Sequence, residues 1–582
     1  MSSYESDKDF FLKANNYLLD KKYLQAESMY SELLIKYPKK ESLYYNLGFI
    51  YLNLKNYEKG ILILLKFISF EKKIDDKFYI LLSVLYEKSK NIIRSIRYLK
   101  INYNKNPEKK SFKIAKLYKK IDQIELSDKY LDKCYEISNN KFYKIYKLFN
   151  FPIIYYNNNF YEKKRNVLIK SLKNLIKESF TLTKNQLIDN PIFLHTYNNF
   201  NNAELNLLIK DFFISKYDFL KKNYKRIKNK EKKIKLGVIS EFLSFHTIGK
   251  IFSEIIINLD KSIYEVIIFH SKYTTDSEIK TNIDSNFKSI TLPSDQEEKI
   301  KIILNQNLNI IFYPDIGMST DLLYITYLKL ADKQIVSWGH PDTTGNNNMD
   351  YFISSKYFEQ EGVNSSKNYT EKLIKLNSIP TYFNYPDNIV RKRKTLKNVY
   401  CCPQSIYKFH PDFDEIILGI LKKDKKAKII LVKDNLSIYK KLKKRLLLKN
   451  PDIYKRIFFL NRGDKNFYIS LCSLSSVLLD PLHFGSGTTF YESMTVGTPT
   501  ISLPGDFLRS RTIKGFYDQM QINSSLLIAK DKDDYIDKSI FLATNIEENL
   551  KLREELKNSA KKKLFENKKV IKEFNDLFQK VL

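Results

Sequence analysis

The sequence predicts an array of paired α-helices followed by two α/β domains, each with a parallel sheet covered by helices on both faces. Small residues recur every 32 to 35 positions near the amino terminus, alternating strand and helix patterns begin at residue 233, and a glycine-rich segment follows an apolar run near residue 480. At 582 residues the chain is long enough for several domains, each with its own core.

Lysine and arginine outnumber aspartate and glutamate by 99 to 66, which gives a formal net charge of +33. Such an excess is typical of proteins that bind nucleic acid or anionic membranes. The lysines are scattered over polar helix faces and do not gather in one stripe, so we expect a solvated surface and no nucleic-acid partner. Nucleic-acid binding stays a hypothesis that rests on charge alone and predicts a steeply salt-dependent affinity.

The cysteines and the apolar segments indicate where the protein resides. The four cysteines, Cys134, Cys401, Cys402 and Cys472, show neither the spacing of a metal site nor a disulfide framework. The chain starts with charged residues, and its most apolar stretch, ILILLKFISF, is short and contains a lysine. We therefore expect a soluble, cytoplasmic protein without a membrane span.

Small residues set the period of the amino-terminal region. Ala14, Gly48, Ser83 and Ala115 lie 32 to 35 positions apart, and a second small residue follows each of them after twelve positions. Two antiparallel helices approach closely only where small side chains face each other. The pattern resembles the tetratricopeptide repeat and implies four repeats over residues 1–140, with a groove that binds peptides or proteins. A helical bundle without registered repeats is the alternative.

Residues 141–232 keep a helical pattern with polar interruptions, and we expect them to connect the repeat array to the α/β domains. The period then changes, because apolar runs such as KLGVIS and VIIFH alternate with amphipathic segments. This alternation predicts a doubly wound, Rossmann-like lobe over residues 233–390 and a second one over residues 391–582. Ligands bind such sheets beyond the carboxyl ends of the strands, and two of them leave a cleft between them.

The segment DPLHFGSGTTFYESMTVGTP joins the apolar strand SSVLLD to a helix. Gly485 and Gly487 let the backbone approach a ligand, and the free amides of Thr488 and Thr489 at the start of the helix attract an anion such as a diphosphate. Glu492, one turn into the helix, is placed to accept hydrogen bonds from ribose hydroxyls. Alone this loop is a weak signal, because many α/β domains use one only to turn the chain.

Four segments, in this order, resemble the O-GlcNAc transferase family: KLGVISEFLSFHTIGK, ADKQIVSWGHPDTTGNNNMDYFIS, VYCCPQSIYKFHP and LLDPLHFGSGTTFYESMTVGTPTISLPGDFLRSR. The resemblance covers roughly residues 233–530. It implies a GT-B fold, in which two Rossmann-like domains face each other, joined to tetratricopeptide repeats. It also implies inverting transfer of a sugar, by default N-acetylglucosamine, from a UDP-sugar to Ser or Thr of acceptor proteins held by the repeat array.

The resemblance implies roles for individual residues of this chain. Lys408 matches the family lysine that contacts the diphosphate, where a cation stabilises the leaving UDP. Thr488 and Thr489 match the paired threonines whose amides hold the phosphates. Glu492 falls where the family usually has an aspartate on the ribose, and Gln404 lies one position from the family's uracil-side glutamine.

His246 matches a histidine near the acceptor end of the cleft that has been considered as the catalytic base. The near-neutral pKa of an imidazole suits removal of a hydroxyl proton. A histidine that only caps the following helix is the alternative. His340 replaces a tyrosine of the animal members, and Asp315 supplies a carboxylate where those members have an Asp and a His upstream; both are expected in the donor or acceptor cleft. The family histidine directly before the paired threonines is Gly487 here.

No metal and no other cofactor are expected. Asp412 and Asp414 form a D-x-D pattern, by which another glycosyltransferase fold holds a divalent cation. They follow Pro411 in the first turn of a predicted helix, where carboxylates interact favourably with the helix dipole. The departures from the family leave two alternatives open: a non-catalytic repeat scaffold with a degenerate transferase region, and a GT-B enzyme that uses another nucleotide sugar such as UDP-glucose. A homodimer formed through the repeat array is also left open.

Overall fold

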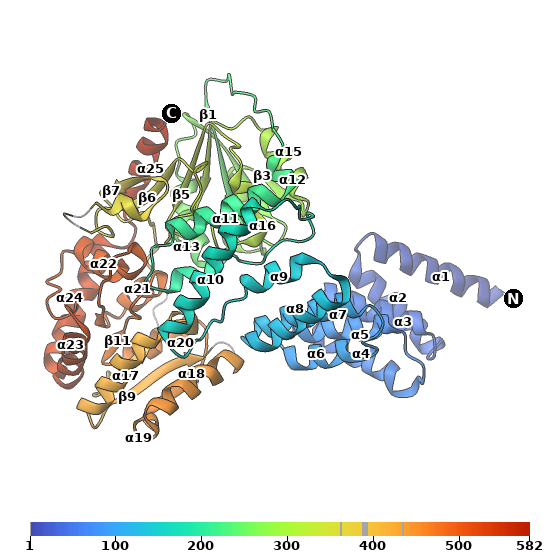
Figure 1. Ribbon diagram of the computed structural model, residues 1–582, viewed down its shortest axis with the longest axis horizontal. Coiled ribbons are helices and arrows are strands. Elements are labelled where there is room, and N and C mark those ends of the chain that lie inside the picture. The colour runs from blue at the N-terminus through green and yellow to red at the C-terminus, as the bar shows by residue number, and fades with distance from the viewer. Residues whose placement is uncertain (1, 361, 363, 387–393, 434–435) are drawn as a thin grey trace. The chain divides into compact units, whose positions relative to one another are not determined.

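The computed structural model describes residues 2–360, 362, 364–386, 394–433 and 436–582 (Figure 1). The chain divides into two compact units, Met1–Pro152 and Ile153–Leu582. The first is helical and the second contains two parallel sheets, which confirms the predicted fold class. The boundary expected between the two lobes, at residues 390 and 391, lies outside the described residues. In the described part of the chain, no helix is both long and apolar enough to span a bilayer.

The first unit is a series of helix pairs. Its helices are α1 (Ser2–Leu19), α2 (Tyr23–Lys36), α3 (Glu41–Asn53), α4 (Tyr57–Phe70), α5 (Asp76–Lys88), α6 (Ile92–Lys100), α7 (Pro107–Lys120), α8 (Ile124–Ser138) and α9 (Lys141–Leu148). Each of the first four pairs turns at one residue in the left-handed conformation, and these are Lys21, Lys55, Lys90 and Asp122. The turns therefore repeat with the same period as the small residues, although no glycine marks them in the sequence.

The small residues lie where the helices of a pair touch, as the sequence predicts. Ser83 and Ser95 are fully buried, their hydroxyls lie 2.9 Å apart, and Ser95 Oγ donates to the Ser83 carbonyl at 2.7 Å. A Cβ added to Gly48 of α3 would lie 2.8 Å from the side chain of Leu64 in α4, the other helix of its pair. Larger side chains at these positions would separate the helices, so the repeat period is set by packing.

The second unit begins with α10 (Asn158–Lys177), α11 (Ala203–Lys216) and α12 (Asp218–Lys221), followed by a seven-stranded parallel sheet of order β3-β2-β1-β4-β5-β6-β7. The strands are β1 (Ile234–Ser240), β2 (Tyr264–Ser271), β3 (Lys288–Leu292), β4 (Ile310–Tyr313), β5 (Lys333–Ser337), β6 (Tyr351–Ser355) and β7 (Lys372–Leu376). The helices between them are α13 (Thr247–Ile257), α14 (Glu278–Asn286), α15 (Gln296–Leu304) and α16 (Thr320–Leu323).

A second parallel sheet follows, with the order β10-β9-β8-β11-β12. Its strands are β8 (Val399–Cys402), β9 (Lys428–Lys433), β10 (Ile457–Asn461), β11 (Val477–Leu479) and β12 (Thr500–Ile501). Its helices are α17 (Pro411–Lys423), α18 (Leu436–Lys449), α19 (Pro451–Tyr454), α20 (Lys465–Leu474), α21 (Thr488–Met494), α22 (Thr512–Met520), α23 (Lys532–Thr544) and α24 (Ile546–Lys563). Both sheets are wound in the same sense, so strand order reverses beside β1 in one and beside β8 in the other. Ligands of doubly wound sheets bind at this reversal.

The last helix, α25 (Lys568–Lys580), leaves the second sheet and packs on the first. The Tyr264 hydroxyl donates to the carbonyl of Asn575 at 2.6 Å, and the ring of Phe312 contacts those of Phe574 and Phe578. The carboxyl-terminal end of residues 391–582 therefore belongs structurally to the first lobe, which the alternating pattern does not predict. The two lobes are thus tied together at a second place besides the cleft.

Two strands of the first sheet are also absent from the sequence prediction. β3 and β7 form its two edges, and most of their side chains are exposed or half-buried. A strand that buries only part of one face carries no continuous apolar run. The inner strands are buried on both faces, and their continuous apolar runs make them recognisable in the sequence.

A buried ion pair between repeats provides a test of the first unit. Lys110 is 4% exposed and its Nζ lies 2.6 Å from Asp76 Oδ1. Asp76→Ala leaves the ammonium buried without a counterion, and we expect the unit to lose about 3–5 kcal/mol of stability. Asp132→Ala is the control, because Asp132 lies in α8 beside α7, it and its partner Lys147 are 50% and 39% exposed, and the loss should stay below about 1 kcal/mol. Hydrogen exchange of the α7 amides measures both, and equal losses would contradict the assignment.

Candidate functional site

Most of the residues singled out in the sequence lie in or just after three loops that follow the carboxyl ends of β1, β8 and β11, whereas Asp315 follows β4 and His340 follows β5. His246 directly precedes α13 after β1, Gln404 and Lys408 follow β8, and the glycine-rich loop joins β11 to α21. β1 is a neighbour of β4, and β8 is a neighbour of β11, at the two points where strand order reverses. The topology therefore brings together segments that are remote in sequence, as in Thr247 and Thr488, whose hydroxyls lie 3.4 Å apart.

Lys408 ties the loop after β8 to the glycine-rich loop. Its Nζ donates to Gly485 O at 2.8 Å and to Gln404 Oε1 at 2.8 Å. The amide of Gln404 in turn donates to Thr489 Oγ1 at 2.9 Å, in the first turn of α21. Gln404 and Thr489 are thus linked to the lysine in one chain of hydrogen bonds, which places a cation beside the start of a helix.

Burial lowers the pKa of Lys408 to about 8, and the Asp480 carboxylate opposes that shift. The ammonium therefore stays mainly protonated at neutral pH but is close to losing its proton. Asp480 itself has a raised pKa because it is buried. Its two oxygens accept hydrogen bonds from the amide and hydroxyl of Ser486, at 2.7 and 2.9 Å, and from the hydroxyl of Ser502 at 2.8 Å. By accepting these hydrogen bonds, Asp480 fixes the conformation of the glycine-rich loop.

The two glycines of the loop have different surroundings. A Cβ on Gly485 would lie 2.8 Å from Asp480 Oδ2 and 2.9 Å from Thr512 Oγ1, so any larger residue would displace the loop. A Cβ on Gly487 would meet nothing within 4 Å. Gly485 is therefore required by packing, whereas Gly487 faces open space at the position where the family carries a histidine.

The first turn of α21 offers free donors. Among the described residues, none accepts a hydrogen bond from the backbone amides of Thr488 or Thr489. Thr488 is 9% exposed and Thr489 is half-buried, and the Thr489 carbonyl is held by the hydroxyl of Tyr468 at 2.9 Å. Unpaired amides with a nearby ammonium attract an anion. The sequence does not single out Tyr468.

Two cavities lie along the cleft. One, of about 430 Å³, is lined by Gln404, Tyr468 and Thr489, and the other, of about 440 Å³, by Ser253 and Tyr385 among others. Both volumes fall within the usual range for small-molecule sites. The two cavities share four lining residues, which are Phe245, Lys250, Lys465 and Glu492. The cavities therefore adjoin each other at the boundary between the lobes.

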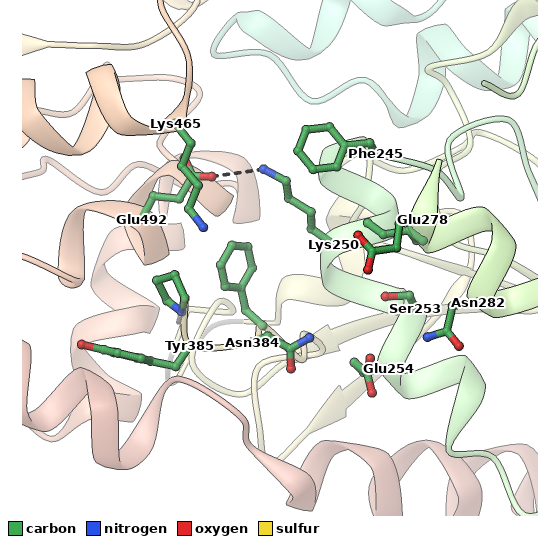
Figure 2. A pocket seen from close by; sticks show the side chains of 13 residues that line it. Phe245, Lys250, Ser253, Glu254, Glu278, Asn282, Asn384, Tyr385, Lys465 and Glu492 are labelled. Atoms are coloured by element: carbon green, nitrogen blue, oxygen red, sulfur yellow. Dashed lines mark hydrogen bonds and ion pairs between the residues drawn. The ribbon is translucent and has the colours of Figure 1, made fainter. Parts of the chain in front are cut away.

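An ion pair crosses that boundary. Figure 2 shows Lys250 of α13 reaching Glu492 of α21, and the Nζ–Oε1 distance is 3.2 Å. The side chain of Glu492 is 11% exposed and that of Lys250 is 27% exposed. The carboxylate expected to bind a ribose is thus already paired with a lysine of the other lobe. Sequence reasoning missed Lys250, because nothing in the local pattern indicates a partner 242 residues away.

His246 caps α13. Its Nδ1 accepts a hydrogen bond from the Ile248 amide at 3.3 Å. Burial, and secondarily the charge of Lys250, lowers the pKa of His246 to about 4. A neutral imidazole whose Nδ1 accepts carries its proton on Nε2. In this arrangement neither ring nitrogen offers a free lone pair, which favours the capping interpretation over that of a base. The catalytic role expected for His246 stays a prediction.

His340 and Asp315 lie behind the cleft. They are 4% and 5% exposed, and neither lines the two cavities above. His340 Nε2 lies 2.8 Å from the hydroxyl of Thr196, and its ring stacks on Phe193. Burial raises the pKa of Asp315 to about 7. Their expected place in the donor or acceptor cleft stays a prediction.

The D-x-D carboxylates diverge. Asp414 is fully buried and accepts from Arg445 Nη2 at 2.8 Å, so its charge is already neutralised. Asp412 instead meets His410 and His483. In the described part of the chain, these three side chains form a group whose metal-ligating atoms lie close together. His483 is not singled out in the sequence, because it is 71 residues from Asp412.

Comparisons with known proteins agree with this geometry. Residues 391–574 match the model of glycosyl transferase family 41. The chain is 23% identical over 273 residues to the UDP-glucose:protein N-beta-glucosyltransferase of Actinobacillus pleuropneumoniae serotype 5b, and equally to that of serotype 7. These matches cover 44% of this chain and 42% of each relative, so the alignment spans less than half the length of those proteins.

Among solved structures, a mutant of Thermobaculum terrenum O-GlcNAc transferase has the same fold, with a TM-score of 0.64 over 100% of this chain and 98% of that chain, at 15% identity. The family match and this fold confirm the resemblance to the O-GlcNAc transferase family. The residues that match the family 41 model follow a unit of paired, tetratricopeptide-like helices.

The cap formed by His246 can be tested by two substitutions. His246→Ala removes the acceptor for the Ile248 amide, and we expect α13 to lose about 0.5–2 kcal/mol of stability. His246→Asn replaces the accepting nitrogen with a side-chain oxygen that caps helices well, so its stability should stay close to that of the unmodified protein. Hydrogen exchange of the α13 amides compares the variants. If the Asn variant loses as much stability as the Ala variant, the side chain does more than cap.

Proposed function

We propose that this protein is an inverting glycosyltransferase that moves a sugar from a UDP-sugar to Ser or Thr side chains of acceptor proteins. The observation that carries this proposal is the chain of hydrogen bonds from Gly485 through Lys408 and Gln404 to Thr489, inside the segment that matches family 41. That chain sets an ammonium beside unpaired amides, which is the combination that a departing UDP diphosphate requires. No metal is needed for this step, because the lysine and the helix supply the positive charge.

We expect the two cavities to hold different parts of the UDP-sugar. The uracil and ribose of UDP fit the cavity lined by Gln404, Tyr468 and Glu492, with the diphosphate at the start of α21. The sugar would then point along the cleft toward the second cavity. Glu492 can accept a ribose hydroxyl only if it shares its carboxylate with Lys250 or releases it. Donor binding is therefore expected to weaken the ion pair between the lobes.

The donor sugar is proposed to be N-acetylglucosamine by default. The curated relatives are named UDP-glucose:protein N-beta-glucosyltransferases, which makes UDP-glucose the second donor to test and a nitrogen acceptor the second acceptor chemistry. Gly487 bears on this choice, because the space beside it is open where the family has a histidine. We propose that the tetratricopeptide-like unit supplies the binding surface for the acceptor protein, and that UDP-sugar and acceptor are the only partners the reaction needs.

Lys408→Ala tests the proposed function. Removing the ammonium takes away charge stabilisation of the leaving UDP, and we expect turnover to fall by about 10²- to 10³-fold. Lys423→Ala is the control, because Lys423 is an exposed lysine of α17 that pairs with Asp537. The measurement is mass spectrometry of an acceptor protein after incubation with UDP-N-acetylglucosamine or UDP-glucose, together with UDP release. Full turnover in the Lys408 variant would refute the proposed role, and absence of UDP binding by the unmodified protein would favour the scaffold alternative.

The affinity for UDP should depend on pH through Lys408. The pKa of this lysine is about 8 in the free protein, and a bound diphosphate raises it. Below pH 8 the lysine is protonated in both states and the affinity should stay level. Above pH 8 the free protein loses the proton that the complex keeps, so the affinity should fall, by up to about tenfold per pH unit. Calorimetry between about pH 7 and 9.5 measures this decline.

Lys408→Arg is the matched variant for the pH series, because a guanidinium stays protonated throughout this range. Its affinity should be lower than that of the unmodified protein at neutral pH but should not fall in alkaline buffer. The same decline in both proteins would mean that another group titrates.

A further inference from the structure

Three side chains with metal-ligating atoms meet at the start of α17. Asp412 Oδ2 lies 2.8 Å from His483 Nε2 and 3.2 Å from His410 Nδ1. The ligand atoms of all three lie within 4.8 Å of one another. His410 and Asp412 come from the amino-terminal turn of α17, and His483 comes from the loop after β11. The cluster therefore joins two segments of the second lobe that are remote in sequence.

The carboxylate is held in place by a residue outside the cluster. Asn158 Nδ2 donates to the other oxygen, Asp412 Oδ1, at 2.7 Å. The side chains of His410, Asp412 and His483 are 5%, 23% and 14% exposed. The site is thus largely buried but still reachable from solvent. An orienting hydrogen bond to a ligating carboxylate is a usual feature of metal sites.

His410 and Asp412 place two hydrogen-bond acceptor atoms in contact with each other. His410 Nδ1 accepts from the Asp412 backbone amide at 3.3 Å, so this nitrogen presents a lone pair. The same nitrogen faces the Asp412 carboxylate oxygen at 3.2 Å, and that oxygen can only accept. Two acceptors in contact repel each other unless a cation lies between them. A proton on His410 Nδ1 or a metal ion bound to it satisfies this contact, and each takes the lone pair that the Asp412 amide uses.

The spacing suits a metal ion. Zinc binds imidazole nitrogens and carboxylate oxygens at about 2.0–2.2 Å, so ligands of a tetrahedral site lie roughly 3.3–3.6 Å apart. The 3.2 Å separation between Asp412 and His410 reaches that range with a shift of a few tenths of an ångström, and the 2.8 Å separation between Asp412 and His483 needs a shift of roughly half an ångström or more. Two imidazoles and one carboxylate are ligands for transition metals rather than for Mg²⁺ or Ca²⁺, which prefer oxygen alone.

We propose that His410, Asp412 and His483 bind one divalent transition-metal ion of the zinc class, with a fourth position left for water. The ion would clamp the start of α17 to the glycine-rich loop. Phe484, next to His483, lies under the Lys408 ammonium at 4.9 Å from its ring centre, so the clamp would steady the wall of the anion site without touching the diphosphate. The ion is structural, and the proposal does not rest on the proposed transferase activity.

A second histidine–aspartate contact in the chain provides the comparison. His270 Nε2 lies 2.7 Å from Asp284 Oδ1, but Lys280 occupies the other carboxylate oxygen at 2.5 Å. The lysine supplies the positive charge there, so no cation is required. His270→Gln is therefore a control that removes a histidine from a similar contact without removing a proposed ligand.

Metal binding is tested on the full, tag-free chain after chelation. Titration with Co²⁺ should give the visible absorption of a four-coordinate cobalt site and saturate at one ion per chain, and Zn²⁺ should displace it and raise the melting temperature. Asp412→Asn and His483→Gln should each weaken Zn²⁺ binding by at least about tenfold to hundredfold, whereas His270→Gln should not. His483 lies in a loop, so its variant keeps the test valid if the Asp412 change disturbs α17. Absence of stoichiometric Co²⁺ and Zn²⁺ binding, or binding by both ligand variants equal to that of the unmodified chain, would overturn the proposal.

Discussion

The candidate site depends on one buried ammonium group. Lys408 is withdrawn from water, which costs free energy unless the charge meets oxygens, and two of them, Gly485 O and Gln404 Oε1, are supplied by the loops on either side. Satisfying the ammonium therefore fixes the positions of both loops relative to each other. Since Gln404 also binds Thr489, the same constraint sets the first turn of α21. The anion site is organised before any ligand arrives, which is the condition for effective charge stabilisation.

The first lobe lies opposite this site, and its side chains limit how the site can bind a ligand. The segment after β1 faces the segment after β11 across the cleft, where the hydroxyls of Thr247 and Thr488 lie 3.4 Å apart. Lys250 and Glu492 meet there at 3.2 Å. A carboxylate that is already paired binds a sugar hydroxyl less readily than a free one, because the ligand must compete with the lysine. The ion pair thus couples the geometry of the cavity lined by Gln404 and Tyr468 to the position of the first lobe.

The sequence was sufficient where the signal is local. Inner strands such as β1 form continuous apolar runs, and the glycine-rich loop is conspicuous in a chain with only 15 glycines. The sequence did not predict elements that lack a local signal, or contacts between segments that lie far apart in the chain. Most side chains of the edge strands β3 and β7 are exposed or half-buried, and α25 packs on a sheet formed by residues much earlier in the chain. Lys250, Tyr468 and His483 are ordinary residues in their own segments. Their place beside Glu492, Thr489 and Asp412 arises only when the two sheets form and bring strand ends together.

His246 shows how a residue can match a family position without the geometry of the role considered for it. A base must present a lone pair to the acceptor hydroxyl, yet Nδ1 of His246 is engaged by the Ile248 amide and the proton then resides on Nε2. A pKa of about 4 means that the neutral ring also binds a proton weakly. Such an imidazole can donate a hydrogen bond from Nε2, which orients an acceptor or the sugar but does not remove a proton. Unless the ring turns away from α13, this arrangement favours the capping interpretation of His246, and the catalytic role expected for it stays a prediction.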